Sequence, residues 1–232
     1  MIGVGPRNNI EFYNSPLSAQ GYLNDPVTLG EDRICEILRE VPGTVIEVGC
    51  GAGRMYEAQG TSPSKWVGVD YAQTPLQLLA QRHPDVRVVQ ADAAALPFAN
   101  GTFGAALLGY HMLESILPAA RRRQALAEAA RVVEPGGEVI VTRHLGRSYH
   151  RVGQVLAIVR RQAHEFGDLV GPARHGAGEF RMHVLGSREM AAATRLAGLV
   201  LNQTWDYRDG GPVSLRSVSV VERYSVLRGV KQ

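Results

Sequence analysis

The sequence predicts an α/β fold with a doubly wound, mostly parallel sheet of seven strands. One of the seven, near the C-terminus, is expected to be antiparallel. Three observations predict it. Five short apolar runs in the first 142 residues alternate with helical stretches. These runs are rich in β-branched side chains, which is typical of strands buried on both faces of a parallel sheet. Two further runs near the C-terminus flank a turn, and such a hairpin adds an antiparallel strand.

Five expected strands form the parallel part of this sheet. Each is a run of five to seven residues bounded by Gly, Pro or Asp. Helices cover both faces of such strands, which therefore lack the polar alternation of a surface strand. The five runs are Thr44–Gly49, Lys65–Asp70, Val86–Ala91, Phe103–Gly109 and Glu138–Thr142.

Helices are expected in the connections between these strands. Thr74 is followed by proline and is expected to cap a helix over Leu76–Arg82. Pro118 is expected to open a longer helix, in which Leu126 and Val133 recur on one apolar face. Alternation of strands with helices builds βαβ units, which make the sheet doubly wound.

The C-terminal third has a different pattern. Apolar residues have helical spacing from Arg147 to about Arg161, and the glycine-rich stretch 167–186 is expected to be an ordered loop or lid. Ser187 is expected to cap a helix that ends near Ala197. Two strands, Leu199–Tyr207 and Ser214–Leu227, then flank the turn sequence Asp209–Pro212.

Composition places the chain among ordinary globular proteins. Hydrophobic residues make up 45% and charged residues 20%, which argues against a disordered, collagen-like or coiled-coil protein. No apolar run approaches a membrane span, and the N-terminus lacks the apolar core of a secretory signal, so a cytoplasmic location is expected. Cys35 and Cys50 are too few for a disulfide framework or a Cys-rich zinc site, and no metal site is expected.

The net charge of +3 is unevenly distributed along the chain. Residues 1–116 contain seven basic and twelve acidic residues, whereas residues 117–232 contain eighteen and ten. A basic half suits an acidic ligand or nucleic acid. The alternative is a solvated, arginine-rich surface.

The most informative segment is 45–53, where a strand runs into a glycine-rich turn and then a helix. Glycines in such a turn let the backbone approach a ligand, and the helix N-terminus offers free amide donors. Asp70 and Asp92 each lie at the end of a following strand, at the edge where ligands bind in open α/β sheets. A carboxylate there accepts hydrogens from a ribose diol or from an exocyclic amine. The alternative is a purely structural tight turn.

Two classes of cofactor suit a ribose-binding acid at this place. A dinucleotide site prefers Gly-x-Gly-x-x-Gly, but Arg54 stands at the third glycine position here. Glu47 precedes the loop and would repel a pyrophosphate, whereas it would attract an ammonium or a sulfonium. A cationic cofactor is therefore favoured, and a nicotinamide dehydrogenase is a disfavoured alternative.

Residues 45–53 resemble the first motif of class I S-adenosylmethionine-dependent methyltransferases. Four further segments resemble the later motifs of that family, in the same order and spacing. They are Val67–Tyr71, Val88–Phe98, Phe103–Glu114 and Arg131–Val141. The resemblance covers about residues 40–142 and implies S-adenosylmethionine as the cofactor. It implies that Gly49, Cys50, Gly51 and Gly53 form the loop facing the methionine part of the cofactor, and that Glu47 supports this loop or binds the ammonium group. Gly109 and Tyr110 would border the methionine chain and the sulfonium, Asp70 would bind the ribose hydroxyls, and Tyr71, Asp92 and Ala93 would contact the adenine.

This resemblance suggests how a single domain over residues 1–232 is divided. Residues 1–40 would form a helical N-terminal lid and 41–143 the cofactor-binding core. Residues 144–186 would form an insertion on the substrate side, and 187–232 a helix with a strand hairpin.

The sequence lacks the residues that are typical of enzymes acting on several classes of methyl acceptor. After the fourth strand, Gly109 and Tyr110 replace the Asn/Asp-Pro-Pro run that is typical of enzymes acting on exocyclic amines of bases. Lys65 and Lys231 are the only lysines, and neither is placed like the catalytic lysine of ribose methyltransferases. Nucleic acid is therefore disfavoured as a partner, and a small molecule or peptide is expected.

Four residues are candidates on the acceptor side. Tyr13 and Tyr22 are candidates to close over the sulfonium through cation–π contacts, or to pack an N-terminal helix. His111 and His144 each follow a strand end and are candidates to take a proton, or to make local hydrogen bonds.

The function expected from these residues is methyl transfer from S-adenosylmethionine to oxygen or nitrogen of a small metabolite, secondary metabolites included. The alternatives are a peptide N-methyltransferase and a non-catalytic S-adenosylmethionine-binding protein. The sequence leaves the oligomeric state open.

Overall fold

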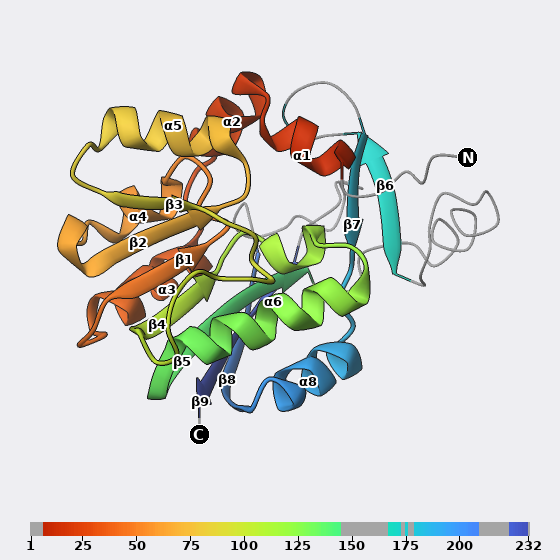
Figure 1. Cartoon of the computed structure of the whole chain (residues 1–232). Helices are drawn as coiled ribbons and strands as arrows, with labels where there is room; N and C mark the ends of the chain where they lie inside the picture. The colour runs from red at the N-terminus through yellow and green to blue at the C-terminus, as the bar shows by residue number, and fades with distance from the viewer. Residues whose placement is uncertain (1–6, 145–166, 173–174, 176–178, 209–222, 232) are drawn as a thin grey trace.

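The computed structural model describes residues 7–144, 167–172, 175, 179–208 and 223–231 (Figure 1). Its main sheet has seven strands in the order β3-β2-β1-β4-β5-β9-β8. Strand β9 pairs antiparallel with both β5 and β8, and the other pairs are parallel. The predicted fold class is therefore confirmed. The strands are β1 Val45–Val48, β2 Trp66–Asp70, β3 Arg87–Gln90, β4 Phe103–Leu108, β5 Val133–His144, β8 Leu199–Arg208 and β9 Arg223–Lys231.

Helices cover both faces of this sheet, as the apolar strands require. Helices α3 (Leu29–Arg39), α4 (Arg54–Gln59) and α5 (Gln73–Arg82) pack on one face, and α6 (Ala119–Val132) and α8 (Ser187–Leu196) pack on the other. Short 3₁₀ helices η1 (Pro63–Lys65) and η2 (Met112–Ser115) lie in the connections. None of the helices in the described part of the chain is long and apolar enough to cross a membrane.

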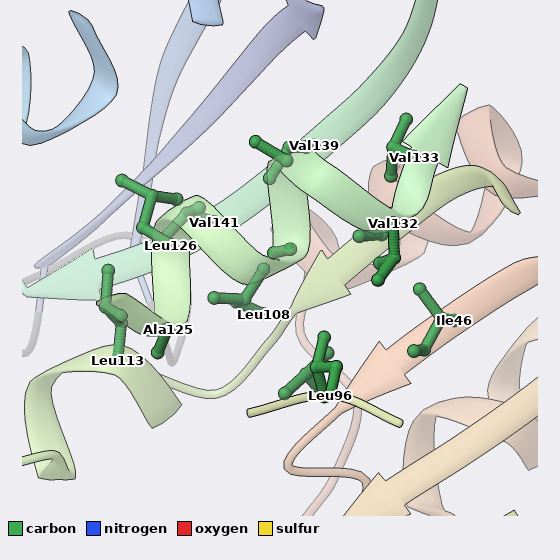
Figure 2. Packing of buried hydrophobic residues seen from close by; sticks show 14 of the residues in the cluster. Ile46, Leu96, Leu108, Leu113, Ala125, Leu126, Val132, Val133, Val139 and Val141 are labelled. Atoms are coloured by element: carbon green, nitrogen blue, oxygen red, sulfur yellow. The ribbon is translucent and has the colours of Figure 1, made fainter. Parts of the chain in front are cut away.

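The core follows the two-residue period of the strands. Ala105 and Leu107 of β4 belong to the apolar cluster with α3, α4 and α5, whereas Ala106 and Leu108 belong to the cluster with α6 and α8. Figure 2 shows the second cluster, in which Leu126 of α6 lies over the sheet. Every one of these side chains is fully buried.

Two N-terminal helices and a small second sheet complete the described structure. Helices α1 (Arg7–Tyr13) and α2 (Pro16–Leu23) precede the sheet, and α1 packs against the strand pair β6 (Asp168–Pro172) and β7 (Glu179–His183) (Figure 1). These two strands pair antiparallel. The prediction of a loop or lid over 167–186 was therefore wrong, because a two-stranded sheet occupies half of this stretch.

Several element boundaries also differ from the predictions. Thr74 does not cap α5, which begins at Gln73. Instead, Asn14 Oδ1 accepts hydrogen bonds from the backbone N–H of Gln73 and of Thr74, at 2.8 and 3.1 Å. A cap from a residue so far away in the sequence leaves no local signal.

Strand β5 begins at Val133, earlier than predicted, and this residue pairs with Phe103 instead of continuing α6. The register then shifts before Glu138, so the irregular stretch that contains the expected turn lies within the strand. Strand β9 extends past Leu227 to Lys231. The helical stretch expected at 147–161, the turn at 209–212 and the start of the last strand at 214–222 lie outside the described residues.

Candidate active site

The glycine-rich loop lies where β1 meets α4, as predicted. The backbone N–H groups of Gly49 and Cys50 both donate to the carbonyl of Val69, at 2.7 and 3.0 Å, and this fixes the loop against the end of β2. Gly51 has φ +54°, and a Cβ built on it would meet nothing within 4 Å. Gly53 is different, because a Cβ there would lie 2.4 Å from a methyl of Leu79, so this glycine allows α4 and α5 to pack closely.

Gly51→Ala should separate ligand binding from folding. Gly60, at the C-terminus of α4, is a matched control, because its φ is +58° and a Cβ there would also meet nothing. Alanine at either position should destabilise the fold by about 1–2 kcal/mol through the left-handed backbone. Only Gly51→Ala should also lower the affinity for S-adenosylhomocysteine, by at least about tenfold, since its methyl group would project into the space beside the loop. Thermal unfolding and isothermal titration calorimetry measure the two effects, and equal affinities in both variants would contradict the prediction.

Asp70 lies at the end of β2 and joins this loop to the next turn. Its Oδ2 accepts from the N–H of Gly51 and its Oδ1 from the N–H of Ala72, each at 2.9 Å. Burial raises the pKa of this carboxyl, and the backbone hydrogen bonds oppose that shift. Each carboxylate oxygen can accept a further hydrogen bond, so the group remains able to bind a diol.

Glu47 is a buried acid on β1, only 3% exposed. Burial raises its pKa to about 8. Its Oε2 has no hydrogen-bond partner among the described residues, and the residue borders the cavity described below. A buried carboxyl oxygen without a partner is costly, so this geometry fits a cationic or hydrogen-bond-donating ligand group.

Asp92 and Ala93 follow β3 at the same edge of the sheet. Asp92 Oδ1 accepts from the N–H of Ala94 at 2.9 Å, and its Oδ2 forms an ion pair with Arg121 of α6. The Asp92 side chain is 52% exposed, so this ion pair is in contact with solvent. The predicted adenine contact therefore lies beside an arginine that the sequence did not indicate.

One cavity of about 980 Å³ joins these parts. All of the predicted cofactor residues except Gly53 line it. Its remaining wall comes from α1, α2, η2, the start of α6 and the β6–β7 pair. The predicted residues in the wall are Glu47, Gly49, Cys50, Gly51, Asp70, Tyr71, Asp92, Ala93, Gly109, Tyr110, Tyr13 and Tyr22.

The two predicted lid tyrosines contact aromatic rings of the cofactor edge. The ring centroid of Tyr13 lies 6.1 Å from that of Tyr71, and the centroid of Tyr22 lies 5.6 Å from that of Tyr110. Tyr110 Oη also donates to Asp25, which follows α2, at 2.5 Å. These contacts connect the N-terminal helices to the strand ends across the cavity.

The two predicted histidines lie next to each other but not in the cavity wall. Their rings stack with centroids 3.9 Å apart, and each residue is 8% exposed. His144 Nδ1 lies 2.5 Å from Glu114 Oε2, and Glu114 is fully buried. The structure therefore gives His111 and His144 buried packing and hydrogen-bonding positions.

Several residues of the cavity wall escaped the sequence reasoning. Arg54 forms an ion pair with Glu31 of α3, and its guanidinium lies 4.7 Å from the ring centroid of Tyr110. Asp168 and Arg181 come from β6 and β7, in the stretch that was predicted to be a loop. The two-residue alternation of these strands was the one available signal, and the glycine-rich sequence around them concealed it. Among the described residues, no group of three or more His, Cys, Asp or Glu side chains could hold a metal ion.

Comparisons with known proteins find similar sequences for the part of the chain that contains the glycine-rich loop. Residues 45–137 match the family model of a methyltransferase domain. A demethylmenaquinone methyltransferase from Renibacterium salmoninarum is 31% identical over 51% of this chain and 51% of its own length. A tRNA (carboxymethyluridine(34)-5-O)-methyltransferase from Arabidopsis thaliana is 30% identical over 47% of this chain and 26% of its own. A solved SAM-dependent methyltransferase from Methanosarcina mazei has a TM-score of 0.70 at 15% identity, covering 85% of this chain and 96% of that one.

Residues 45–137 thus match a methyltransferase domain, and the predictions of an S-adenosylmethionine-dependent methyltransferase and of its cofactor are confirmed. The cofactor fits the residues present: Gly51 leaves open space, Glu47 has an unpartnered oxygen and Asp70 can accept further hydrogens. The chain spans about half the length of the curated relatives it matches. Those relatives are named for different acceptors, so the shared half does not identify the acceptor.

Proposed function

We propose that this protein transfers the methyl group of S-adenosylmethionine to an oxygen or nitrogen atom of a small molecule. The observation that carries the proposal is the single cavity, which joins the glycine-rich loop to a second wall made by α1, α2, η2 and the β6–β7 pair. A cofactor at the strand ends would leave the rest of this space for an acceptor. The name of the demethylmenaquinone methyltransferase supports a small acceptor.

When bound, S-adenosylmethionine supplies an electrophilic methyl group on a positive sulfur. The residues of this chain then bind and orient the reactants and exclude water. In the proposed arrangement, Asp70 accepts from the ribose hydroxyls, Glu47 faces the ammonium group, and Tyr71, Asp92 and Ala93 border the adenine. Gly49, Cys50, Gly109 and Tyr110 border the methionine chain, and Tyr13 and Tyr22 close the cavity above the sulfonium.

Under this proposal residues 1–40 act as the lid, 41–143 as the cofactor core, 144–186 as the substrate-side insertion and 187–232 as the C-terminal cover of one domain. A cytoplasmic location remains a prediction. Nucleic acid stays disfavoured as the acceptor, because Ile10, Leu23 and Ile116 make part of the second wall apolar. The name of the tRNA methyltransferase makes RNA an alternative to include in the test.

A panel assay tests the proposed reaction. The protein is incubated with S-adenosylmethionine and hydroxylated aromatic acids, quinols, amines, short peptides and tRNA, and mass spectrometry follows the gain of one methyl group and the release of S-adenosylhomocysteine. A methylated small molecule supports the proposal, whereas methylated peptide or tRNA replaces it. Cofactor binding without any turnover would favour the non-catalytic alternative.

Binding of S-adenosylhomocysteine near pH 7 is expected to release a proton from Glu47. Burial holds the pKa of Glu47 at about 8 in the unliganded protein, so the carboxyl is largely protonated at pH 7. A nearby ammonium favours the charged carboxylate and lowers this pKa, and the proton is then lost on binding. Calorimetry at pH 7 in buffers with different ionisation enthalpies should show a release that approaches one proton in the wild type and disappears in Glu47→Gln. The same release in both proteins would contradict the role of Glu47.

A further inference from the structure

Among the described residues, three arginines line the cavity, and two of them already have acidic partners. Arg54 pairs with Glu31 and Arg121 pairs with Asp92. Arg181 of β7 has neither a side-chain hydrogen bond nor an ion pair within the described part of the chain, and its Nε is buried without a partner. A partly buried guanidinium without an acceptor is costly, and the fixed fork of donors matches a carboxylate. This arginine is therefore available to an anionic ligand.

The backbone of Arg181 is held rigidly at this place. Asn9 of α1 accepts from the N–H of Arg181 at 3.2 Å and donates to its carbonyl at 2.8 Å. The same Asn9 amide donates to the carbonyl of Ser115 in η2, at 3.1 Å. Asn9 thus joins three parts of the cavity wall, and the base of the arginine side chain is positioned before any ligand binds.

A second charged group lies on the same strand pair. Asp168 faces His183 across the strands, and Val170 faces Arg181. Because side chains alternate along each strand, Asp168 and Arg181 point to the same face of the pair. Asp168 also lines the cavity and is 5% exposed.

A series of hydrogen bonds between charged or titratable side chains holds the Asp168 side chain. His183 Nδ1 lies 2.7 Å from Asp168 Oδ1, and His183 Nε2 lies 2.9 Å from Glu189 Oε2. Arg122 donates to the other oxygen of Glu189 at 3.2 Å. Burial lowers the pKa of His183, but its hydrogen bonds to Glu189 and Asp168 outweigh this and raise it overall. The hydrogen bonds of His183 to Asp168 and Glu189 therefore hold the Asp168 side chain in place.

We infer that the methyl acceptor is a small hydroxy or amino carboxylic acid, whose carboxylate binds Arg181 and whose nucleophilic O–H or N–H donates to Asp168. This inference rests on the proposed function and specifies its acceptor. The acceptor's lone pair forms the new bond to the methyl carbon, and the carbon–sulfur bond breaks with its electron pair going to sulfur. The proton of the acceptor passes to the Asp168 carboxylate. A single guanidinium suits a carboxylate monoanion better than a phosphate dianion, because Asp168 shares its face.

Calorimetry on protein saturated with S-adenosylhomocysteine tests both contacts with defined probes: the three hydroxybenzoate isomers, benzoate and phenol. At least one hydroxybenzoate should bind at least tenfold more tightly than phenol. Arg181→Met should remove this preference and leave the affinity for phenol unchanged. Asp168→Asn should bring the affinity for that hydroxybenzoate down to the affinity for benzoate. Arg188→Met, which changes an exposed arginine of α8, is the matched control and should bind like the wild type.

The results separate this inference from the proposed function. If the wild type binds S-adenosylhomocysteine but no hydroxybenzoate more tightly than phenol, the carboxylate site is refuted and the methyltransferase proposal stands. The same holds if Arg181→Met keeps the preference. If the wild type fails to bind S-adenosylhomocysteine, the proposed function itself is refuted. Where a hydroxybenzoate is methylated, Asp168→Asn should lower kcat by about 100-fold or more while the affinity for S-adenosylhomocysteine stays unchanged.

Discussion

Asp70→Ala is expected to weaken the binding of S-adenosylhomocysteine by about 1.5–3 kcal/mol, which corresponds to roughly ten- to 150-fold in Kd. The substitution removes the proposed charge-assisted contact with the ribose hydroxyls. It also removes the acceptor of the Gly51 N–H and of the Ala72 N–H, so the loop loses one of its hydrogen bonds to β2. Isothermal titration calorimetry measures the change.

Two further variants make this result interpretable. Asp70→Asn keeps the shape and one acceptor oxygen and should fall between the wild type and the alanine variant. Asp85→Ala changes an exposed acid between α5 and β3 and should bind normally. An unchanged Kd in a folded Asp70→Ala protein would mean that this acid does not contact the cofactor.

Glu114→Ala is expected to destabilise the fold by about 3–5 kcal/mol, the range measured when one partner of a buried ion pair is removed. Glu114 is fully buried in η2. Its Oε1 accepts from the N–H of Leu185 at 2.8 Å, and its Oε2 accepts from the N–H of His144 at 3.0 Å and contacts the imidazole of the same histidine. This one carboxylate therefore joins η2, the end of β5 and the segment before α8. Removing it leaves several buried donors without an acceptor.

Urea unfolding measures this loss of stability. Glu36→Ala is the control, because Glu36 is 56% exposed and pairs with Arg33 within the same helix. Such surface pairs contribute at most about 1 kcal/mol, so this variant should unfold close to the wild type. Glu114→Gln should lie between the two, since its amide oxygen can replace one of the two acceptors. A stability of Glu114→Ala equal to that of Glu36→Ala would refute the structural role.

The sequence predicted the sheet because buried parallel strands are short, apolar and separated by punctuating residues. It predicted the cofactor edge because Asp70 and Asp92 end strands, and parallel strands end at one edge. It did not predict which way the side chains after those ends point. His111 and His144 follow strand ends as expected, but they stack beside Glu114 and not in the cavity wall.

Long-range partners account for the other differences. Asn14 caps a helix 59 residues ahead of it, and no local pattern encodes such a cap. Arg181 and Asp168 enter the wall through the pairing of β6 with β7, which a glycine-rich stretch concealed. The prediction therefore missed these two charged residues of the cavity wall, whereas all of the predicted cofactor residues except Gly53 line the cavity.

Two asparagines of the N-terminal segment, Asn9 and Asn14, have a consequence for the proposed turnover. Asn9 holds α1 to β7 and η2, and Asn14 caps α5 through two hydrogen bonds. Any departure of spent nucleoside that displaces this segment must break several of these bonds at once. These hydrogen bonds would then also govern the residence time of the product, so a variant that lacks them should release the product faster.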